Sequence, residues 1–159
     1  MGTVYHANPL LCGEYPRTLI LGTFPSPLSR EKAEYYGNPH NQFWRVLFGV
    51  FGRPFAGPSY EEKKALLFEN GVALWDVITS CEIEGALDSA IRSPVYNTAL
   101  PGWIAEHNIR KVLFNGQNAY AFYKRGIGVI DRNVLPSTSP AHAAMRVEEK
   151  TRRWAEGLR

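Results

Sequence analysis

The 159-residue sequence has little cysteine and no long hydrophobic run. Its two cysteines, Cys12 and Cys81, are far apart in the chain, with no second cysteine pair and no histidines at ligand spacing. This arrangement argues against a zinc site and against a disulfide framework, so we expect both thiols to be reduced and Cys81 to be packed. No apolar run is long enough to cross a bilayer, and residues 1–16 lack the basic start and apolar core of a secretory signal. We therefore expect a soluble, cytoplasmic protein with no membrane partner.

A dense run of lysine or arginine is also absent. The formal net charge is +3, which suits a nucleic-acid partner but is common in proteins without one. Any phosphate contacts would have to come from scattered side chains and backbone amides. Charge alone assigns no function.

Several widespread enzyme motifs are missing. The sequence has no GxGxxG after a strand, no Walker A lysine loop, no GxSxG and no HExxH. Its four histidines, His6, His40, His107 and His142, show no metal-ligand spacing. These absences disfavour phosphate-cofactor enzymes, and we expect neither a metal nor another cofactor.

The segments that are present alternate between strand and helix patterns. Buried strands are expected at 18–21 and within 71–76, 109–116 and 128–142, and helices at 41–51 and within 58–71, 97–108, 117–125 and 144–159. Ser59 and Glu62 form a capping-box pattern at the start of the second helix. Segment 86–97 is ambiguous and shows at most one helical turn. The alternation predicts a single domain, residues 1–159, with a three-layer α/β/α sandwich around a mostly parallel sheet.

The stretch YYGNPHNQFW at 35–44 combines a helix start with residues that the fold does not require. Asn38 suits an N-cap and Pro39 suits the first helical position. Tyr35, Tyr36 and Asn41 are left without a role in folding.

Four expected strand ends carry small, polar or backbone-bending residues: GTFPS, WDVITS, FNG and LPSTSPAH. Ligands of open α/β sheets bind beyond the carboxyl ends of the strands, so these four segments predict a polar crevice. Its amides, hydroxyls, Asp76 and aromatic rings could hold a flat heterocycle and read its edge, as enzymes that extrude a base must do. A nucleobase is the natural candidate ligand.

Five segments together resemble the DNA-deoxyinosine glycosylases, or hypoxanthine-DNA glycosylases, a branch of the uracil-DNA glycosylase superfamily. They are LILGTFPSPLS, YYGNPHNQFWRVL, GVALWDVITSCEIEGALDSAI, VLFNG and LPSTSPAH, and the similarity extends along nearly the whole chain. The resemblance implies a DNA-repair enzyme that flips a deaminated base, above all hypoxanthine, out of DNA and hydrolyses its N-glycosidic bond with water. No lysine lies in these segments for a Schiff base, so a monofunctional glycosylase that leaves an abasic site is expected.

The resemblance also gives roles to individual residues. The first catalytic motif, around the sugar and the water, is Gly22, Thr23, Phe24, Pro25 and Ser26. Many relatives place an Asp or Asn there, and this chain does not. The hypoxanthine branch shares that absence and takes an asparagine from the next segment, which matches Asn41 here, with Asn38 as its rival. Because Asn38 is expected to cap the helix, we assign the water to Asn41.

Three further residues are implied in base binding, each with a structural alternative. Tyr36 matches the aromatic residue that stacks on the flipped base, although it could simply pack in the core. Asp76 corresponds to the base-reading region, or else caps the following turn. Asn115 is a base reader by resemblance, but its place before Gly116 favours a turn former.

The last motif is implied to grip the DNA backbone and to wedge the duplex open. It comprises Ser137, Thr138, Ser139, Pro140, Ala141 and His142. Ser137 and Ser139 would contact phosphates, and His142 would donate to a phosphate or stabilise the departing base, unless it is a loop histidine with no role.

Alternative functions remain open at this stage. The enzyme could prefer uracil in mismatches, or the chain could be a non-catalytic nucleic-acid-binding module, since the first motif lacks an acid. An enzyme on free nucleosides is disfavoured by the wedge loop. We expect a monomer whose partner is DNA with a deaminated base.

Overall fold

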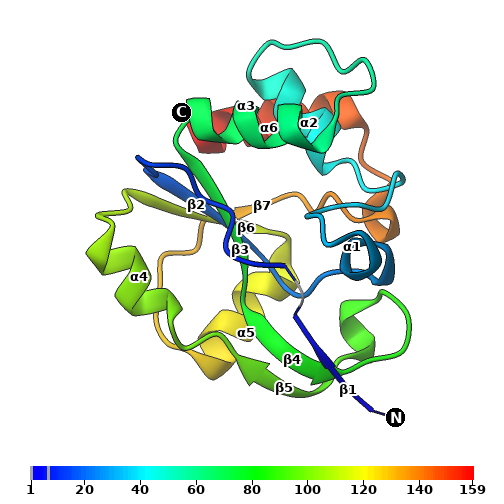
Figure 1. Cartoon of the computed structure of the whole chain (residues 1–159), viewed down its shortest axis with the longest axis vertical. Helices are drawn as coiled ribbons and strands as arrows, with labels where there is room; N and C mark the ends of the chain where they lie inside the picture. Colours follow the sequence, from blue (N-terminus) through cyan, green and yellow to red (C-terminus); the bar gives the residue numbers. More distant parts are fainter. Residues whose placement is uncertain (1, 7) are drawn as a thin grey trace.

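The computed structural model describes residues 2–6 and 8–159, and a four-stranded parallel sheet lies at its centre (Figure 1). The strands follow the order β3-β2-β6-β7 and span Thr18–Gly22 (β2), Val72–Asp76 (β3), Lys111–Asn115 (β6) and Val134–Leu135 (β7). In the β2 and β3 pair, Gly22 is opposite Asp76, so both strands end at the same level. All four strands were expected from the sequence, and β7 is shorter than its segment suggested.

Helices cover both faces of this sheet. Helices α2 (Phe43–Val50), α3 (Tyr60–Glu69) and α6 (Val147–Leu158) lie together on one face, and α4 (Leu100–Glu106) and α5 (Gln117–Gly126) lie on the other (Figure 1). Side chains alternate along β2: Ile20 joins the core beneath α2, α3 and α6, whereas Leu19 and Leu21 join the core beneath α4 and α5. The predicted three-layer α/β/α sandwich is confirmed.

A second, antiparallel sheet was not expected from the sequence. It contains β1 (Thr3–Tyr5), β4 (Ile78–Glu82) and β5 (Arg92–Tyr96) in the order β1-β4-β5. The ambiguous segment 86–97 forms a 3₁₀ turn, η1 (Asp88–Ala90), and then β5, an edge strand that contains a proline and is largely exposed. A largely exposed edge strand with proline carries little hydrophobic pattern, which explains why it was missed.

The expected helix starts are confirmed in one case and wrong in another. Ser59 and Glu62 form the predicted capping box at the start of α3. By contrast, α2 begins at Phe43, after Gln42, so the prediction that Asn38 caps it is wrong. The Asn38 Oδ1 atom instead accepts a hydrogen bond of 2.9 Å from the His40 N–H, because a short asparagine side chain closes readily onto its own loop.

Helix α1 (Pro27–Lys32) is a further element that was not expected from the sequence. The Ser26 side chain caps it by accepting from the Ser29 N–H. Cys81 is fully buried, as predicted. Over residues 2–6 and 8–159, no helix combines the length and the apolar character that a membrane crossing requires.

Candidate active site

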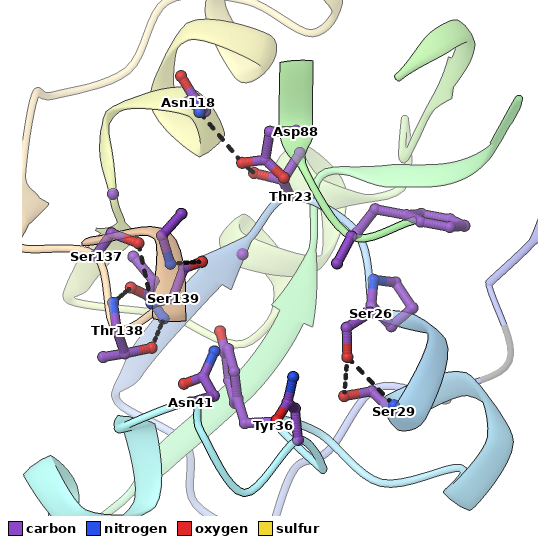
Figure 2. Close-up of a pocket in the computed structure, with 18 of the residues that line it drawn as sticks. Thr23, Ser26, Ser29, Tyr36, Asn41, Asp88, Asn118, Ser137, Thr138 and Ser139 are labelled. Atoms are coloured by element: carbon purple, nitrogen blue, oxygen red, sulfur yellow. Dashed lines mark hydrogen bonds between the residues drawn. The ribbon is translucent and has the colours of Figure 1, made fainter. Parts of the chain in front are cut away.

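A pocket of about 440 Å³ lies where the parallel strands end. Figure 2 shows Tyr36 and Asn41 on one side, Thr23 and Asp88 opposite them, and Ser137, Thr138 and Ser139 on a third wall. The pocket is lined by every residue to which the family resemblance gave a role: Gly22–Ser26, Tyr36, Asn38, Asn41, Asp76, Asn115 and Ser137–His142. The four strand ends therefore meet as predicted.

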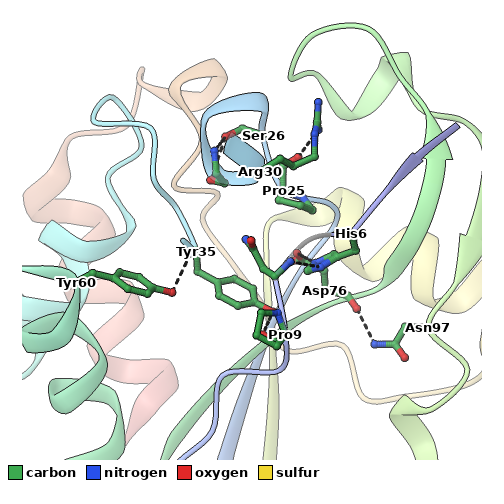
Figure 3. Close-up of polar contacts among 11 residues, drawn as sticks. His6, Pro9, Pro25, Ser26, Arg30, Tyr35, Tyr60, Asp76 and Asn97 are labelled. Atoms are coloured by element: carbon green, nitrogen blue, oxygen red, sulfur yellow. Dashed lines mark hydrogen bonds and ion pairs between the residues drawn. The ribbon is translucent and has the colours of Figure 1, made fainter. Parts of the chain in front are cut away.

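Asp76 ends β3 and is buried. Its Oδ2 atom lies 2.6 Å from the Nε2 atom of His6, which follows β1, so the carboxylate pairs across the two sheets (Figure 3). A Cβ atom added to Gly22 would lie 2.6 Å from Asp76 Oδ1 and 3.0 Å from the Tyr36 hydroxyl. Glycine at the end of β2 thus lets two polar groups approach the same part of the pocket.

Tyr36 serves both the core and the pocket. Its ring stacks on Phe43 with centroids 4.0 Å apart and an interplanar angle of 19°, so the core-packing alternative is partly correct. Its backbone has φ of 54°, a conformation that is rare outside glycine and that clusters at functional sites. Burial, and next the charge of Asp76, raise the pKa of the phenol, which therefore stays protonated.

Asn41 does not occupy the third helical position that the sequence suggested. It precedes α2 by two residues, and its Oδ1 atom accepts a hydrogen bond of 2.9 Å from the Phe43 N–H. An amide oxygen has two lone pairs, so one of them and the Nδ2 donors remain for a ligand. Since Asn38 makes an equivalent bond to His40, the capping argument does not distinguish the two asparagines.

Asn115 positions the loop at 137–142 from the end of β6. Its Nδ2 atom donates to Thr138 Oγ1 at 2.9 Å, and its Oδ1 atom accepts from the Thr138 N–H at 3.0 Å. Thr138 is fully buried, and its carbonyl accepts from the Gln42 N–H at 3.0 Å. His142 is exposed at the end of the short 3₁₀ helix η2 (Pro140–His142). The amide thus ties this loop to the central sheet.

Asp88 lines the pocket but was not predicted as a site residue. Its Oδ2 atom accepts hydrogen bonds from Thr23 Oγ1 at 3.1 Å and from Asn118 Nδ2 at 3.4 Å. Burial raises the pKa of its carboxyl, the charge of Asp76 adds to the rise, and the bonds from Thr23 and Asn118 oppose it. The residue lies in the segment that was ambiguous in sequence, and no spacing rule indicated it.

His6 and Asn8 were also missed as site residues, because the segment that carries them has no motif. His6 pairs with Asp76, and Asn8 lines the pocket. Within residues 2–6 and 8–159, no group of three or more His, Cys, Asp or Glu side chains is arranged to hold a metal ion. The chemistry of the described walls is thus that of two carboxylates, several amides and hydroxyls, and aromatic rings.

Comparison with known proteins agrees with this geometry. The family model of the uracil DNA glycosylase superfamily matches residues 10–157. A protein named hypoxanthine DNA glycosylase from Methanosarcina acetivorans is 37% identical over 138 residues, which cover 84% of this chain and 85% of that protein. A protein of the same name from Methanosarcina barkeri is 31% identical over 153 residues, which cover 95% and 96%.

A solved structure is also similar over nearly the whole chain. The solution NMR structure of a Methanosarcina acetivorans protein, provisionally named a uracil DNA glycosylase, has a TM-score of 0.70 and 30% identity to this chain. The similarity covers 96% of this chain and 94% of that one. With its parallel sheet, the pocket at the strand ends and the matched residues, the chain belongs to the uracil DNA glycosylase superfamily.

Proposed function

We propose that this protein is a monofunctional DNA glycosylase that removes deaminated bases, foremost hypoxanthine from deoxyinosine, from DNA. The observation that carries the proposal is the joint placement of Asp76, Tyr36 and the loop 137–142 around one pocket. The two relatives named hypoxanthine DNA glycosylase support the same substrate. We also propose, as the sequence suggested, that it acts as a monomer in the cytoplasm.

Asp76 suits the edge by which hypoxanthine differs from adenine. Hypoxanthine has an N–H donor at N1, whereas adenine has a bare acceptor nitrogen there, and a carboxylate oxygen only accepts. With Oδ2 held by His6, the Oδ1 atom beside Gly22 is left to accept from the base. Adenine would place a lone pair against that oxygen, so adenine would be rejected.

Asp88 and Asn41 suit the sugar and the water. Cleavage of the N-glycosidic bond passes through an oxocarbenium-like sugar, which a nearby carboxylate stabilises. Asp88 supplies such a carboxylate next to Thr23, on the wall opposite Asn41 (Figure 2). Asn41 would orient the attacking water through the free lone pair of Oδ1, which suffices because a cationic sugar accepts a weak nucleophile. Hypoxanthine is also a better leaving group than adenine.

The loop 137–142 suits the DNA backbone. Ser137 Oγ accepts from the Ser139 N–H at 3.2 Å, and Ser139 Oγ accepts from the Ala141 N–H at 3.2 Å, so the loop is held by its own side chains. The exposed Pro140, Ala141 and His142 would meet the duplex, and the hydroxyls of Ser137 and Ser139 would donate to phosphates. A free nucleoside would not require this loop.

Uracil remains the second candidate base, because its N3–H and O4 atoms repeat the donor and acceptor of the N1–H and O6 edge of hypoxanthine. The first experiment is therefore cleavage of duplex oligonucleotides with one deoxyinosine or one deoxyuridine, in chelator, followed by alkali. Wild type, Asn41→Ala and Asn38→Ala are compared. We expect release from deoxyinosine that falls about a hundredfold or more in Asn41→Ala and much less in Asn38→Ala.

Other outcomes would revise the proposal in defined ways. Faster release from deoxyuridine would make uracil the substrate. A larger loss in Asn38→Ala would exchange the roles of the two asparagines. Binding of duplex DNA with release from neither oligonucleotide would leave a nucleic-acid-binding module.

A further inference from the structure

The side chain of Asn8 is a buried amide without a partner in a wall of the pocket. The residue is only 4% exposed, and it lines the pocket. Within residues 2–6 and 8–159, neither its Nδ2 nor its Oδ1 atom has a hydrogen-bond partner. A buried amide that bonds to nothing costs free energy, so a protein that keeps one is expected to satisfy it with a ligand.

Hydrogen bonds hold His6, Asn8 and Pro9 in place. The His6 N–H donates to the Thr79 carbonyl at 2.8 Å, and the Asn8 N–H donates to His6 Nδ1 at 3.1 Å. The Tyr35 hydroxyl donates to the Pro9 carbonyl at 3.0 Å (Figure 3). Pro9 also restricts Asn8 to extended backbone. The amide is therefore presented from a fixed backbone, as a binding group requires.

The hydrogen bonds of His6 define what Asp76 can do. Because the Asn8 N–H can only donate, His6 Nδ1 accepts, and the hydrogen is on Nε2, which donates to Asp76 Oδ2. Asp76 is thus held as an acceptor. It can take the N1–H of hypoxanthine, but it cannot donate to the neighbouring 6-oxygen. Reading the full edge requires a separate donor.

We infer that Asn8 supplies this donor: its Nδ2 group donates to the 6-oxygen of the flipped base while Asp76 accepts from N1–H. Asn8 is then a specificity-determining residue, and His6 is a positioning residue that acts through Asp76. The inference rests on the proposed function, since it concerns the same base. Asn8 lies before the residues 10–157 that the family model matches.

The test compares Asn8→Ala and Asn8→Asp with wild type on duplexes containing deoxyinosine or 2′-deoxynebularine, whose base lacks both the 6-oxygen and the N1 hydrogen. We expect kcat/KM on deoxyinosine to fall about tenfold in Asn8→Ala, the loss of one hydrogen bond, and roughly a hundredfold in Asn8→Asp, where an acceptor faces the 6-oxygen. Release from deoxynebularine is expected to be slower in wild type, because its N1 lone pair faces Asp76 Oδ1, and to change much less between wild type and the variants. The matched control is Asn70→Ala, which removes an amide that bonds to the Leu66 carbonyl outside the pocket.

Two further readouts separate a base contact from a structural role. Affinity for a duplex with an abasic-site analogue should be unchanged in Asn8→Ala, because no base is present. The Tm should not fall, because the removed amide has no partner in the described structure. Unchanged activity on deoxyinosine, or equal losses on deoxyinosine and deoxynebularine, would overturn the inference.

Failure of the proposed function gives a different pattern. In that case wild type releases neither base. Binding of a duplex with non-cleavable 2′-fluoro-deoxyinosine then decides: tighter binding than to plain duplex, lost in Asn8→Ala, supports the base contact without the enzyme activity. Equal affinity of wild type and Asn8→Ala for the 2′-fluoro-deoxyinosine duplex would contradict the base contact.

Discussion

The side-chain ammonium of Lys150 donates a hydrogen bond of 2.7 Å to the backbone carbonyl of His142. The same group donates to Gln42 Oε1 at 2.9 Å. Lys150 is 1% exposed, and burial lowers the pKa of its amine. A single cation from the last helix thus connects the proposed DNA loop to the segment that carries Asn41.

Replacing this lysine should loosen the rim of the pocket. Lys150→Met leaves the Gln42 amide oxygen and the His142 carbonyl without their donor, at a cost of about 1–3 kcal/mol. We expect a lower Tm, and cleavage of deoxyinosine in duplex DNA about tenfold slower than in wild type. Thermal unfolding and single-turnover cleavage measure the two effects. Arg152→Met, on the exposed face of the same helix, is the control. Equal activity in Lys150→Met would show that the rim is held by other contacts.

Asp88 should reduce stability at neutral pH. Its pKa is raised in the folded protein, so its favourable contribution is present below the ordinary carboxyl range and is lost as pH rises through the folded pKa. Asp88→Asn removes this dependence. We therefore expect the variant to be more stable than wild type at pH 7, with the difference shrinking as the pH is lowered. Unfolding midpoints in denaturant across pH 4–8 measure the difference in stability between Asp88→Asn and wild type. A difference that does not change with pH would contradict a raised pKa of Asp88 in the folded protein.

The same change should reduce catalysis. An amide at 88 keeps the size of the side chain but removes the negative charge near the sugar, and we expect kcat to fall about 10- to 100-fold. Single-turnover cleavage of deoxyinosine at pH 7 gives the value. A gain in stability together with a loss of activity would identify Asp88 as a group kept for function. Full activity in Asp88→Asn would show that this carboxylate does not stabilise the sugar during cleavage.

Gly22 should not tolerate a side chain. The Cβ atom of Gly22→Ala would lie 2.6 Å from Asp76 Oδ1 and 3.0 Å from the Tyr36 hydroxyl, so both groups must shift. We expect a loss of about 1–3 kcal/mol in stability and a loss of activity beyond it, measured by unfolding and by cleavage at a temperature where the variant is folded. Gly102→Ala is the control, because nothing lies within 4 Å of its added Cβ and it lies in helix α4. Normal activity in Gly22→Ala would exclude a tight base pocket there.

A stability loss outside the site should leave the chemistry unchanged. The Ser59 side chain caps α3 by accepting a hydrogen bond of 3.1 Å from the Glu62 N–H. Ser59→Ala removes this cap and should lower the free energy of unfolding by about 1 kcal/mol. We expect a lower Tm with the same kcat on deoxyinosine. A parallel loss of kcat would show that activity in the other variants follows stability.

The layered fold and the place of the pocket could be predicted because they rest on local patterns. The run of apolar residues at 19–21 and the capping box at Ser59 are readable without knowledge of the rest of the chain. Parallel strands then place their carboxyl ends together, so the polar residues after them meet. Asp76, Asn115 and the loop 137–142 line one pocket for this reason.

The other groups of the site depend on contacts that no local pattern encodes. Asp88 is brought to Thr23 by an edge-strand segment, and His6 reaches Asp76 from a position 70 residues away. The assignment of Asn38 as a helix cap failed because its side chain bonds within its own loop. Edge strands and asparagine turns are stabilised by tertiary context, so sequence periodicity does not reveal them.

The direct passage from β3 into β4 restricts how the chain can vary in length. Val77 alone separates the two strands, so the parallel sheet ends and the antiparallel sheet begins next to Asp76. Because side chains alternate along a strand, an insertion of one residue here would turn one sheet's side chains to the opposite face. Insertions and deletions during evolution are therefore expected in the loop at 51–59 between α2 and α3, and not between residues 72 and 82.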